Sequence, residues 1–275
     1  MRSTVSWCRC PKSRSDAAPV APRLPSRPWH GSARGAGLAA CIWLALTPAV
    51  IAEGAVRATY EEPTTRYPHG ALGDAVEHAR LTVTFRDGRR SSATLDPTMV
   101  FEDTVPRLVD LDGDGRAEVL VVEAHRDLGA RLAVWTADAA GLRRAVATPW
   151  IGRRFRWLAP LGAADLDGDG RMEIAYVDRP HLDRVLRVWR FGVDPSGAFT
   201  LRELAAAPGL TNHRLGDPAI LGGIRTCGAG PEMITADAAW SRVMATRLLR
   251  DGSLSSRALG PWSPGALSEA LACRM

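Results

Sequence analysis

The sequence Asp110-Leu-Asp-Gly-Asp-Gly-Arg-Ala-Glu118 recurs 55 residues later as Asp165-Leu-Asp-Gly-Asp-Gly-Arg-Met-Glu173. Each copy has aspartate at positions 1, 3 and 5 and glutamate at position 9, with glycine at positions 4 and 6. Clustered carboxylate oxygens on a tight glycine turn are the kind of ligand set that Ca²⁺ prefers. Without a cation, four carboxylates within nine residues repel one another. The repeated pattern therefore predicts two calcium sites.

The predicted ligands are the four carboxylates of each loop and the main-chain carbonyl of the arginine at position 7. They are Asp110, Asp112, Asp114, Arg116 and Glu118 in the first loop and Asp165, Asp167, Asp169, Arg171 and Glu173 in the second. An EF-hand loop needs a bidentate glutamate at position 12. Val121 and Tyr176 stand there instead, inside predicted strands, which excludes an EF-hand. Because protein oxygens nearly fill each cage, we expect the metal to stabilise the fold rather than to catalyse a reaction.

Short apolar segments surround both loops and have the character of β-strands. They are four to seven residues long, rich in β-branched and aromatic side chains, and separated by Gly, Asp or Pro turns. A weaker copy of the same order occupies residues 212–249, where the glycine-rich stretch 222–230 replaces the acidic loop. A further β unit precedes them at residues 67–95, with a hairpin signal at Asp87-Gly88. The chain thus contains four repeated units.

Four-stranded sheets that repeat in this way cover their apolar faces by packing against one another. We therefore expect an all-β fold, a β-propeller of about four four-stranded blades within a single domain at residues 53–275. The predicted units are residues 58–105, 106–155, 156–211 and 212–275. The propeller would be either a small closed ring or an open arc completed by oligomerisation. Closure is favoured because it leaves fewer exposed strand edges.

The two loops and their flanking strands resemble the FG-GAP or VCBS-type repeats of calcium-binding β-propellers, including those of integrin α subunits. The resemblance covers mainly residues 100–250. It implies adhesion or ligand scaffolding, with an unknown protein or glycan as partner. Our first hypothesis is a calcium-stabilised, non-catalytic binding scaffold. The alternative is a hydrolase or lyase with its active site in the central funnel, and a third possibility is an assembly factor that dimerises through an unfinished propeller edge.

Histidines offer a test between a scaffold and an enzyme. His69, His125, His181 and His213 fall at loop-like positions of successive units, and we interpret them as turn residues rather than as a second site. If His69, His181 and His213 gathered with Asp217 around one pocket, the enzyme hypothesis would gain support.

Known catalytic motifs are missing from the sequence. It contains no Gly-x-Ser-x-Gly elbow, phosphate-binding loop or His-Glu-x-x-His zinc motif. Trp135 and Trp189 occupy equivalent positions in their units, and we expect them to pack between blades rather than to stack on a carbohydrate.

The N-terminal region has the features of an export signal. Residues 1–36 are basic and lack apolar periodicity, residues 38–46 are apolar, and Pro48 interrupts that run. We predict a signal peptide cleaved after Ala52, and therefore a periplasmic or secreted protein. The alternatives are an uncleaved anchor or buried helix, although the run is too short to span a bilayer. A lipobox at Cys41 is disfavoured because apolar residues follow the cysteine.

The charge of the chain changes once this leader is removed. Residues 1–52 contain seven basic residues and one acidic residue, so the remainder has 28 basic and 29 acidic residues out of totals of 35 and 30. A nearly neutral mature chain argues against a nucleic-acid partner. Cys227 and Cys273 are the two cysteines that remain, and we predict that they form a disulfide in the exported protein.

Overall fold

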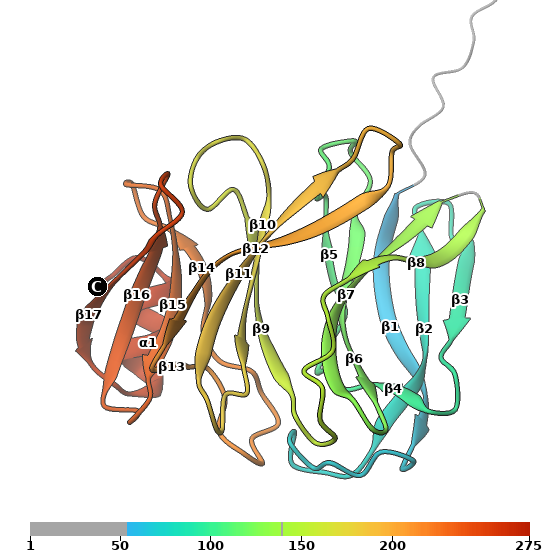
Figure 1. Cartoon of the computed structure of the whole chain (residues 1–275), viewed down its shortest axis with the longest axis horizontal. Coiled ribbons are helices and arrows are strands. Elements are labelled where there is room, and N and C mark those ends of the chain that lie inside the picture. Colours follow the sequence, from blue (N-terminus) through green and yellow to red (C-terminus); the bar gives the residue numbers. More distant parts are fainter. Residues whose placement is uncertain (1–53, 139) are drawn as a thin grey trace, which may run out of the picture. The chain divides into compact units, whose positions relative to one another are not determined.

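A computed structural model describes residues 54–138 and 140–275, and its contacts place all of them in one unit, Ala49–Met275. The predicted signal peptide, its cleavage site and Cys41 lie outside the described residues. The described part is all-β apart from one C-terminal helix (Figure 1). None of its helices is long and apolar enough to cross a membrane.

The first sheet contains eight antiparallel strands in the order β1-β2-β4-β6-β7-β8, with β3 paired to β2 and β5 paired to β6. Its strands are β1 (Ala55–Thr64), β2 (Glu77–Phe85), β3 (Arg90–Thr94), β4 (Met99–Phe101), β5 (Arg107–Val109), β6 (Glu118–His125), β7 (Gly129–Asp138) and β8 (Gly141–Ala147). Both β4 and β5 lie along the same edge of β6, so together they form one interrupted strand.

The second and third sheets repeat this meander. The second has the order β12-β11-β10-β9 and consists of β9 (Leu158–Ala164), β10 (Glu173–Asp178), β11 (Val185–Val193) and β12 (Phe199–Pro208). The third consists of β13 (Leu210–Thr211), β14 (Gly223–Thr226), β15 (Pro231–Asp237), β16 (Arg242–Leu248) and β17 (Leu254–Pro261), with β13 and β14 both paired to β15. Each acidic loop therefore joins the first strand of a meander to its buried second strand.

These sheets do not correspond one to one with the four predicted units. The first two units share a sheet because β4 pairs with β2 through His78 and Phe101 and also pairs with β6. Strands β9 to β12 of the third unit form the second sheet, whereas β13, at the end of that unit, joins the strands of the fourth unit in the third sheet. The described residues thus form three sheets, and the hydrogen bonds do not close them into a barrel.

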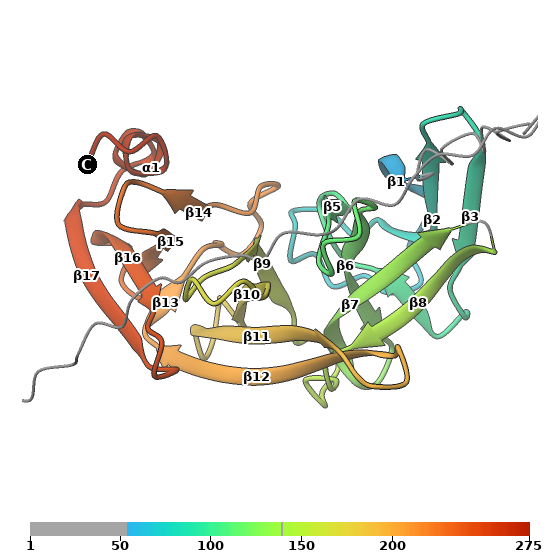
Figure 2. The same cartoon turned by 90° about the horizontal axis from the view of Figure 1, so that it is seen from above.

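The central strands are apolar on both sides because a sheet covers each face. Alternate residues of a strand point to opposite faces. In β6, Leu120 and Val122 join a core shared with the second sheet, whereas Val119 and Val121 join the core of the first sheet. The same alternation in β10 packs one face toward the first sheet and the other toward the third. Seen from above, the long hairpin of β11 and β12 extends beside β8 (Figure 2).

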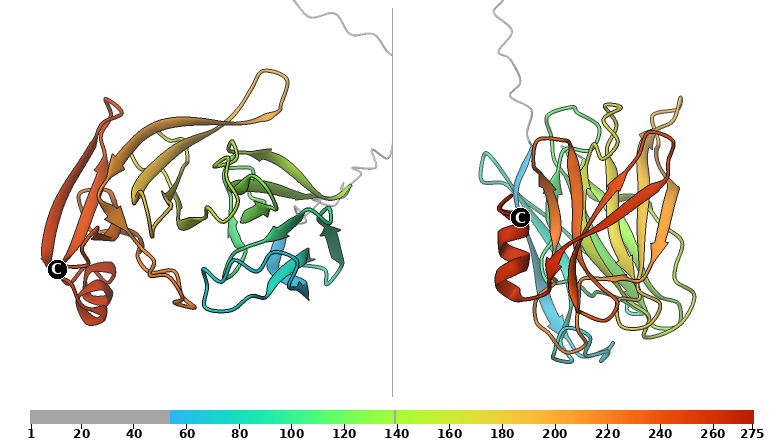
Figure 3. Two further views of the ribbon diagram at one scale, coloured as in Figure 1. Left: turned by 60° about the horizontal axis from the view of Figure 1, so that its bottom comes forward. Right: turned by 90° about the vertical axis from the view of Figure 1, so that its left-hand side faces the viewer.

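Two predictions are confirmed, the packing of two tryptophans and the presence of a disulfide. Trp135 and Trp189 are 5% and 9% exposed and belong to these cores, so they pack rather than present an open stacking surface. The disulfide between Cys227 and Cys273 is present, with 5.6 Å between the Cα atoms. It joins the segment after β14 to the segment after helix α1 (Pro264–Leu271), which packs against the third sheet (Figure 3).

Candidate functional site

The first acidic loop brings three of its predicted ligands together. Carboxylate oxygens of Asp110, Asp112 and Glu118 lie within 4.8 Å of one another. Asp110 accepts hydrogen bonds from the amides of Gly113 and Gly115 at 2.8 and 3.0 Å, which fixes the turn. Both glycines have positive φ angles, of 77° and 83°, that most other residues adopt only with strain. The loop therefore holds a pre-formed group of hard oxygen atoms.

Glu118 is the buried member of this group and has no cationic partner among the described residues. Its Oε2 accepts a hydrogen bond from the amide of Leu111 at 2.9 Å. Burial, together with the carboxylates of Asp112 and Asp114, raises the pKa of Glu118 to about 7. Burial also raises the pKa of Asp112. An added cation would relieve the cost of keeping these groups charged.

The second loop has a similar turn, but an arginine side chain projects into it. Carboxylate oxygens of Asp165, Asp167 and Glu173 again lie within 4.8 Å of one another. Arg190 of β11 projects into this group and is only 6% exposed. Its guanidinium contacts Asp167 at 2.7 Å, Asp169 at 2.6 Å and also Glu173. A side-chain cation therefore already pairs with three carboxylates of the second loop, although burial still raises the pKa of Glu173 to about 7.

Strand register identifies the residue that takes the place of Arg190 in the first unit. Trp189 pairs with Ile174 in the second sheet, and Trp135 pairs with Val119 at the equivalent point of the first. The residue after Trp189 is Arg190, whereas the residue after Trp135 is Thr136. Threonine carries no charge, so the first loop lacks the internal cation of the second.

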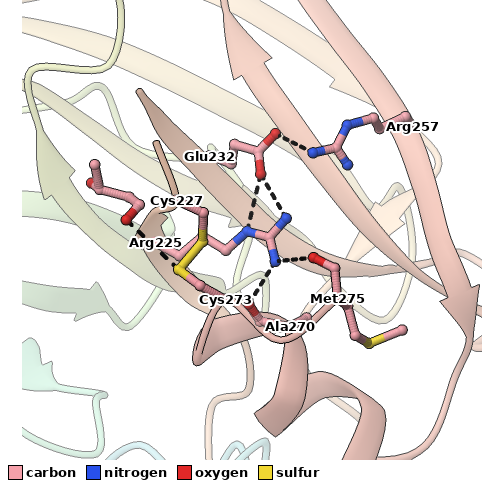
Figure 4. The surroundings of a disulfide bond; sticks show 8 residues. Arg225, Cys227, Glu232, Arg257, Ala270, Cys273 and Met275 are labelled. Atoms are coloured by element: carbon pink, nitrogen blue, oxygen red, sulfur yellow. Dashed lines mark hydrogen bonds and ion pairs between the residues drawn. A yellow bond between two sulfur atoms is a disulfide. The ribbon is translucent and has the colours of Figure 1, made fainter. Parts of the chain in front are cut away.

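A glutamate with a cationic partner recurs in the fourth unit. Glu232 is the second residue of β15, close to the start of its strand, as Glu118 and Glu173 are the first residues of β6 and β10. It accepts hydrogen bonds from Arg225 at 2.7 and 3.0 Å and from Arg257 at 2.6 Å (Figure 4). Of these three glutamates, Glu118 alone has no arginine beside it in the described chain.

Position 5 of each loop behaves differently from the prediction of a direct ligand. Asp114 and Asp169 lie outside the two close oxygen groups. Each accepts hydrogen bonds from the arginine two residues later, Arg116 or Arg171.

The predicted site did not include Arg190 and Thr136, although aligning the units on Trp135 and Trp189 would have placed these two residues at the same position. A cleft of about 310 Å³ lies between the loops and is lined by Asp112 and Arg171 among others.

The histidines gather to a greater degree than their sequence positions indicated. His69 and His181 line one cavity of about 200 Å³. His181 Nε2 lies 2.8 Å from His213 Nδ1, and His213 Nε2 lies 2.8 Å from the main-chain oxygen of Asp217. His125 does not line this cavity; its ring lies tilted against that of Trp150, with 5.7 Å between centroids. Three of the four histidines thus lie close together, but neither His213 nor Asp217 lines the cavity, and Asp217 contributes only its main-chain oxygen.

The loop geometry agrees with a family comparison. Residues 110–176 match the family model described as FG-GAP-like repeat. The chain carries an FG-GAP-like repeat. The match begins at Asp110 of the first loop and extends through the second loop into β10. It supports a β-propeller-type binding domain. No curated protein matches the sequence.

Proposed function

We propose that this protein is an exported, calcium-stabilised FG-GAP-like repeat module that binds a protein or glycan ligand without catalysing a reaction. The repeats stack as the blades of a small β-propeller. One calcium ion binds in the first acidic loop, and Arg190 takes the corresponding place in the second. The two calcium sites expected from the sequence are thus reduced to one in this proposal.

The observation that carries the proposal is the unbalanced charge of the first loop. Asp110, Asp112 and Glu118 direct oxygens to one point, and two of these groups have raised pKa values. The same loop in the next unit has a guanidinium against three of its carboxylates, although burial raises the pKa of Glu173 to about 7 as well. A cation is therefore the missing component of the first loop, and oxygen-only ligands favour Ca²⁺. The ion would fix the loop that borders the cleft between the two repeats.

Isothermal titration with CaCl₂ tests this assignment. We expect one calcium ion per chain for the wild type. Asp112→Asn should abolish the binding heat, whereas the matched substitution Asp167→Asn at the equivalent position should retain it. Addition of a chelator should lower the melting temperature of the wild type and leave that of Asp112→Asn unchanged. Equal calcium binding by the wild type and Asp112→Asn would refute the assignment.

A specific observation also favours the second candidate function, that of a hydrolase or lyase. His69, His181 and His213 converge near one cavity, as an active site on the propeller would require. Burial lowers the pKa of both His69 and His181 to about 4, with Arg156 adding to the effect on His69 and His213 to that on His181. Imidazoles with such low proton affinity are weak general bases at neutral pH. We therefore place binding ahead of catalysis.

A further inference from the structure

The histidine cavity is built by loops from four units, because Leu215, between β13 and β14, lines it as well. His69 precedes β2, Phe155 and Arg156 lie between β8 and β9, and His181 lies between β10 and β11. The ring of Phe155 stacks on His69 with 5.0 Å between centroids, and Trp157 stacks on His181 at 6.0 Å. The cavity volume of about 200 Å³ is below the roughly 300 Å³ of pockets for drug-sized ligands. It fits a smaller organic molecule.

The proton on His69 can be assigned from its partner. His69 Nδ1 lies 2.5 Å from Oε1 of Glu102, a fully buried residue. Burial raises the pKa of Glu102 far above its ordinary value, which favours the neutral carboxyl with one proton to donate. Its Oε2 has no hydrogen-bond partner, so the proton is best placed on Oε1 and donated to Nδ1. His69 Nε2 therefore carries a hydrogen.

The main-chain carbonyl of Asp217 determines which nitrogens of His213 and His181 carry protons. The main-chain oxygen of Asp217 can only accept, so His213 Nε2 donates to it and His213 Nδ1 has a lone pair. His181 Nε2 must then donate to His213 Nδ1. His181 Nδ1 is left as an acceptor. Neither this atom nor His69 Nε2 has a protein partner among the described residues, and neither is enclosed.

Positive charge accumulates beside these two nitrogens. Arg156 lines the cavity, is half-buried, and has only the main-chain oxygen of Phe155 as a side-chain partner in the described chain. Arg184, in the same loop as His181, has a buried Nε without a partner. By contrast, the guanidinium of Arg179 is neutralised by Asp178. The guanidinium of Arg156, half-buried on the cavity wall without a carboxylate, is well suited to an anion, and Arg184, outside the lining, adds positive charge near His181.

Backbone strain and exposed apolar side chains mark the same place. Phe155, Arg179 and Arg184 have φ angles of 55°, 49° and 52°, which residues other than glycine rarely adopt. Strained backbone of this kind tends to cluster at ligand-binding sites. Leu182 and Leu215 line the cavity and are 54% and 67% exposed. They form an apolar border that a ligand could cover.

We propose that this cavity binds a small organic carboxylate that carries a hydroxyl group and an apolar substituent. The carboxylate pairs with Arg156 and accepts a hydrogen bond from His69 Nε2. The hydroxyl group donates to His181 Nδ1, and the apolar substituent covers Leu182 and Leu215. This site is separate from the acidic loops and does not depend on calcium.

Mandelate is a suitable probe because it combines a carboxylate, a hydroxyl group and a phenyl ring. Isothermal titration of the full chain should detect mandelate binding. Mandelamide, which lacks the charge, and phenylacetate, which lacks the hydroxyl group, should each bind at least about tenfold more weakly. Binding should persist when a chelator is present, so its outcome is distinct from that of the calcium experiment. No mandelate binding, or equal binding of mandelate and mandelamide, would overturn the proposal.

Two pairs of variants locate the site. Arg156→Gln should weaken mandelate binding at least about tenfold, whereas Arg153→Gln, on an exposed neighbouring residue outside the cavity lining, should not. Leu215→Asp should weaken binding by charge repulsion, and the similarly sized Leu215→Asn should weaken it less. Leu215 is highly exposed, so both variants should keep the wild-type melting temperature. Equal affinities within each pair would place any mandelate binding elsewhere and refute the assignment.

Discussion

Arg190 donates a hydrogen bond to Asp167, with 2.7 Å between Nη2 and Oδ2, and this contact distinguishes the second acidic loop from the first. The nine-residue loops differ at one position in sequence, yet an arginine on a following strand pairs with three carboxylates of only the second loop. In the first unit Thr136 stands in that place, and its Oγ1 is buried without a hydrogen-bond partner. The residue on the neighbouring strand therefore decides whether a side-chain cation reaches the loop.

Replacing Arg190 by threonine, as in the first unit, should convert the second loop into a calcium site. Without calcium, Arg190→Thr leaves buried carboxylates unpaired and should lower the free energy of unfolding by about 3 to 5 kcal/mol. With calcium, part of this stability should return, and titration should give two ions per chain. Arg171→Thr is the matched control, because Arg171 is exposed and its loss should change stability by less than about 0.5 kcal/mol. A stoichiometry of one for Arg190→Thr would contradict the role assigned to Arg190.

The reverse substitution, Thr136→Arg, should place a guanidinium opposite Glu118. We expect it to abolish the calcium-dependent rise in melting temperature. In the wild type, calcium at 100 times its dissociation constant adds about 2.7 kcal/mol, or roughly 5 to 10 °C for a domain of this size. Thr136→Gln has a side chain of comparable reach without the charge and should keep most of that response. Differential scanning calorimetry with and without calcium measures both variants, and a full response in Thr136→Arg would argue against charge substitution.

The all-β class could be predicted because the strand signals are local. Glu118 to Glu123 and Glu173 to Val177 are short apolar runs bounded by turn residues, and both form central strands. The division into sheets could not be predicted in the same way. It depends on the pairing of Met99–Phe101 with both β2 and β6, which joins two units, and three residues are too few to carry a clear periodic signal.

The candidate sites show the same division between local and distant information. Asp110, Asp112 and Glu118 lie within nine residues, so their convergence follows from one turn. Arg190 lies 17 residues beyond Glu173 and reaches it through strand pairing. His181 and His213 are 32 residues apart and meet through the packing of successive loops. No sequence motif predicts either contact.

Glu77 should make the protein less stable as pH rises. It is 2% exposed, and burial, followed by the carboxylates of Glu102, Asp74 and Asp103, raises its pKa from 4.5 to about 9. Between these two values the folded chain retains a proton that the unfolded chain has lost, so the contribution of Glu77 to stability declines as pH rises. Glu77→Gln should therefore remain more stable than the wild type at pH 9 and lose that advantage near pH 4.5.

Urea unfolding at several pH values measures this difference. Glu62→Gln, at an exposed position of the same sheet, serves as the control and should follow the pH dependence of the wild type. Parallel curves for the wild type and Glu77→Gln from pH 4.5 to pH 9 would show that Glu77 does not retain its proton.

The disulfide between Cys227 and Cys273 should contribute measurably to stability because it closes a loop with a sequence separation of 46 residues. Cys273→Ser should lower the free energy of unfolding by about 2 to 4 kcal/mol, mainly because the unfolded chain gains conformational entropy when the cross-link is removed. Helix α1 should remain attached, because buried Arg225 donates to the main-chain oxygen of Ala270 at 2.6 Å (Figure 4). Urea unfolding with and without dithiothreitol provides the control: the reductant should destabilise the wild type to the level of Cys273→Ser and leave the variant unchanged. If dithiothreitol lowered the stability of the wild type and of Cys273→Ser equally, the effect of the reductant would not come from this disulfide.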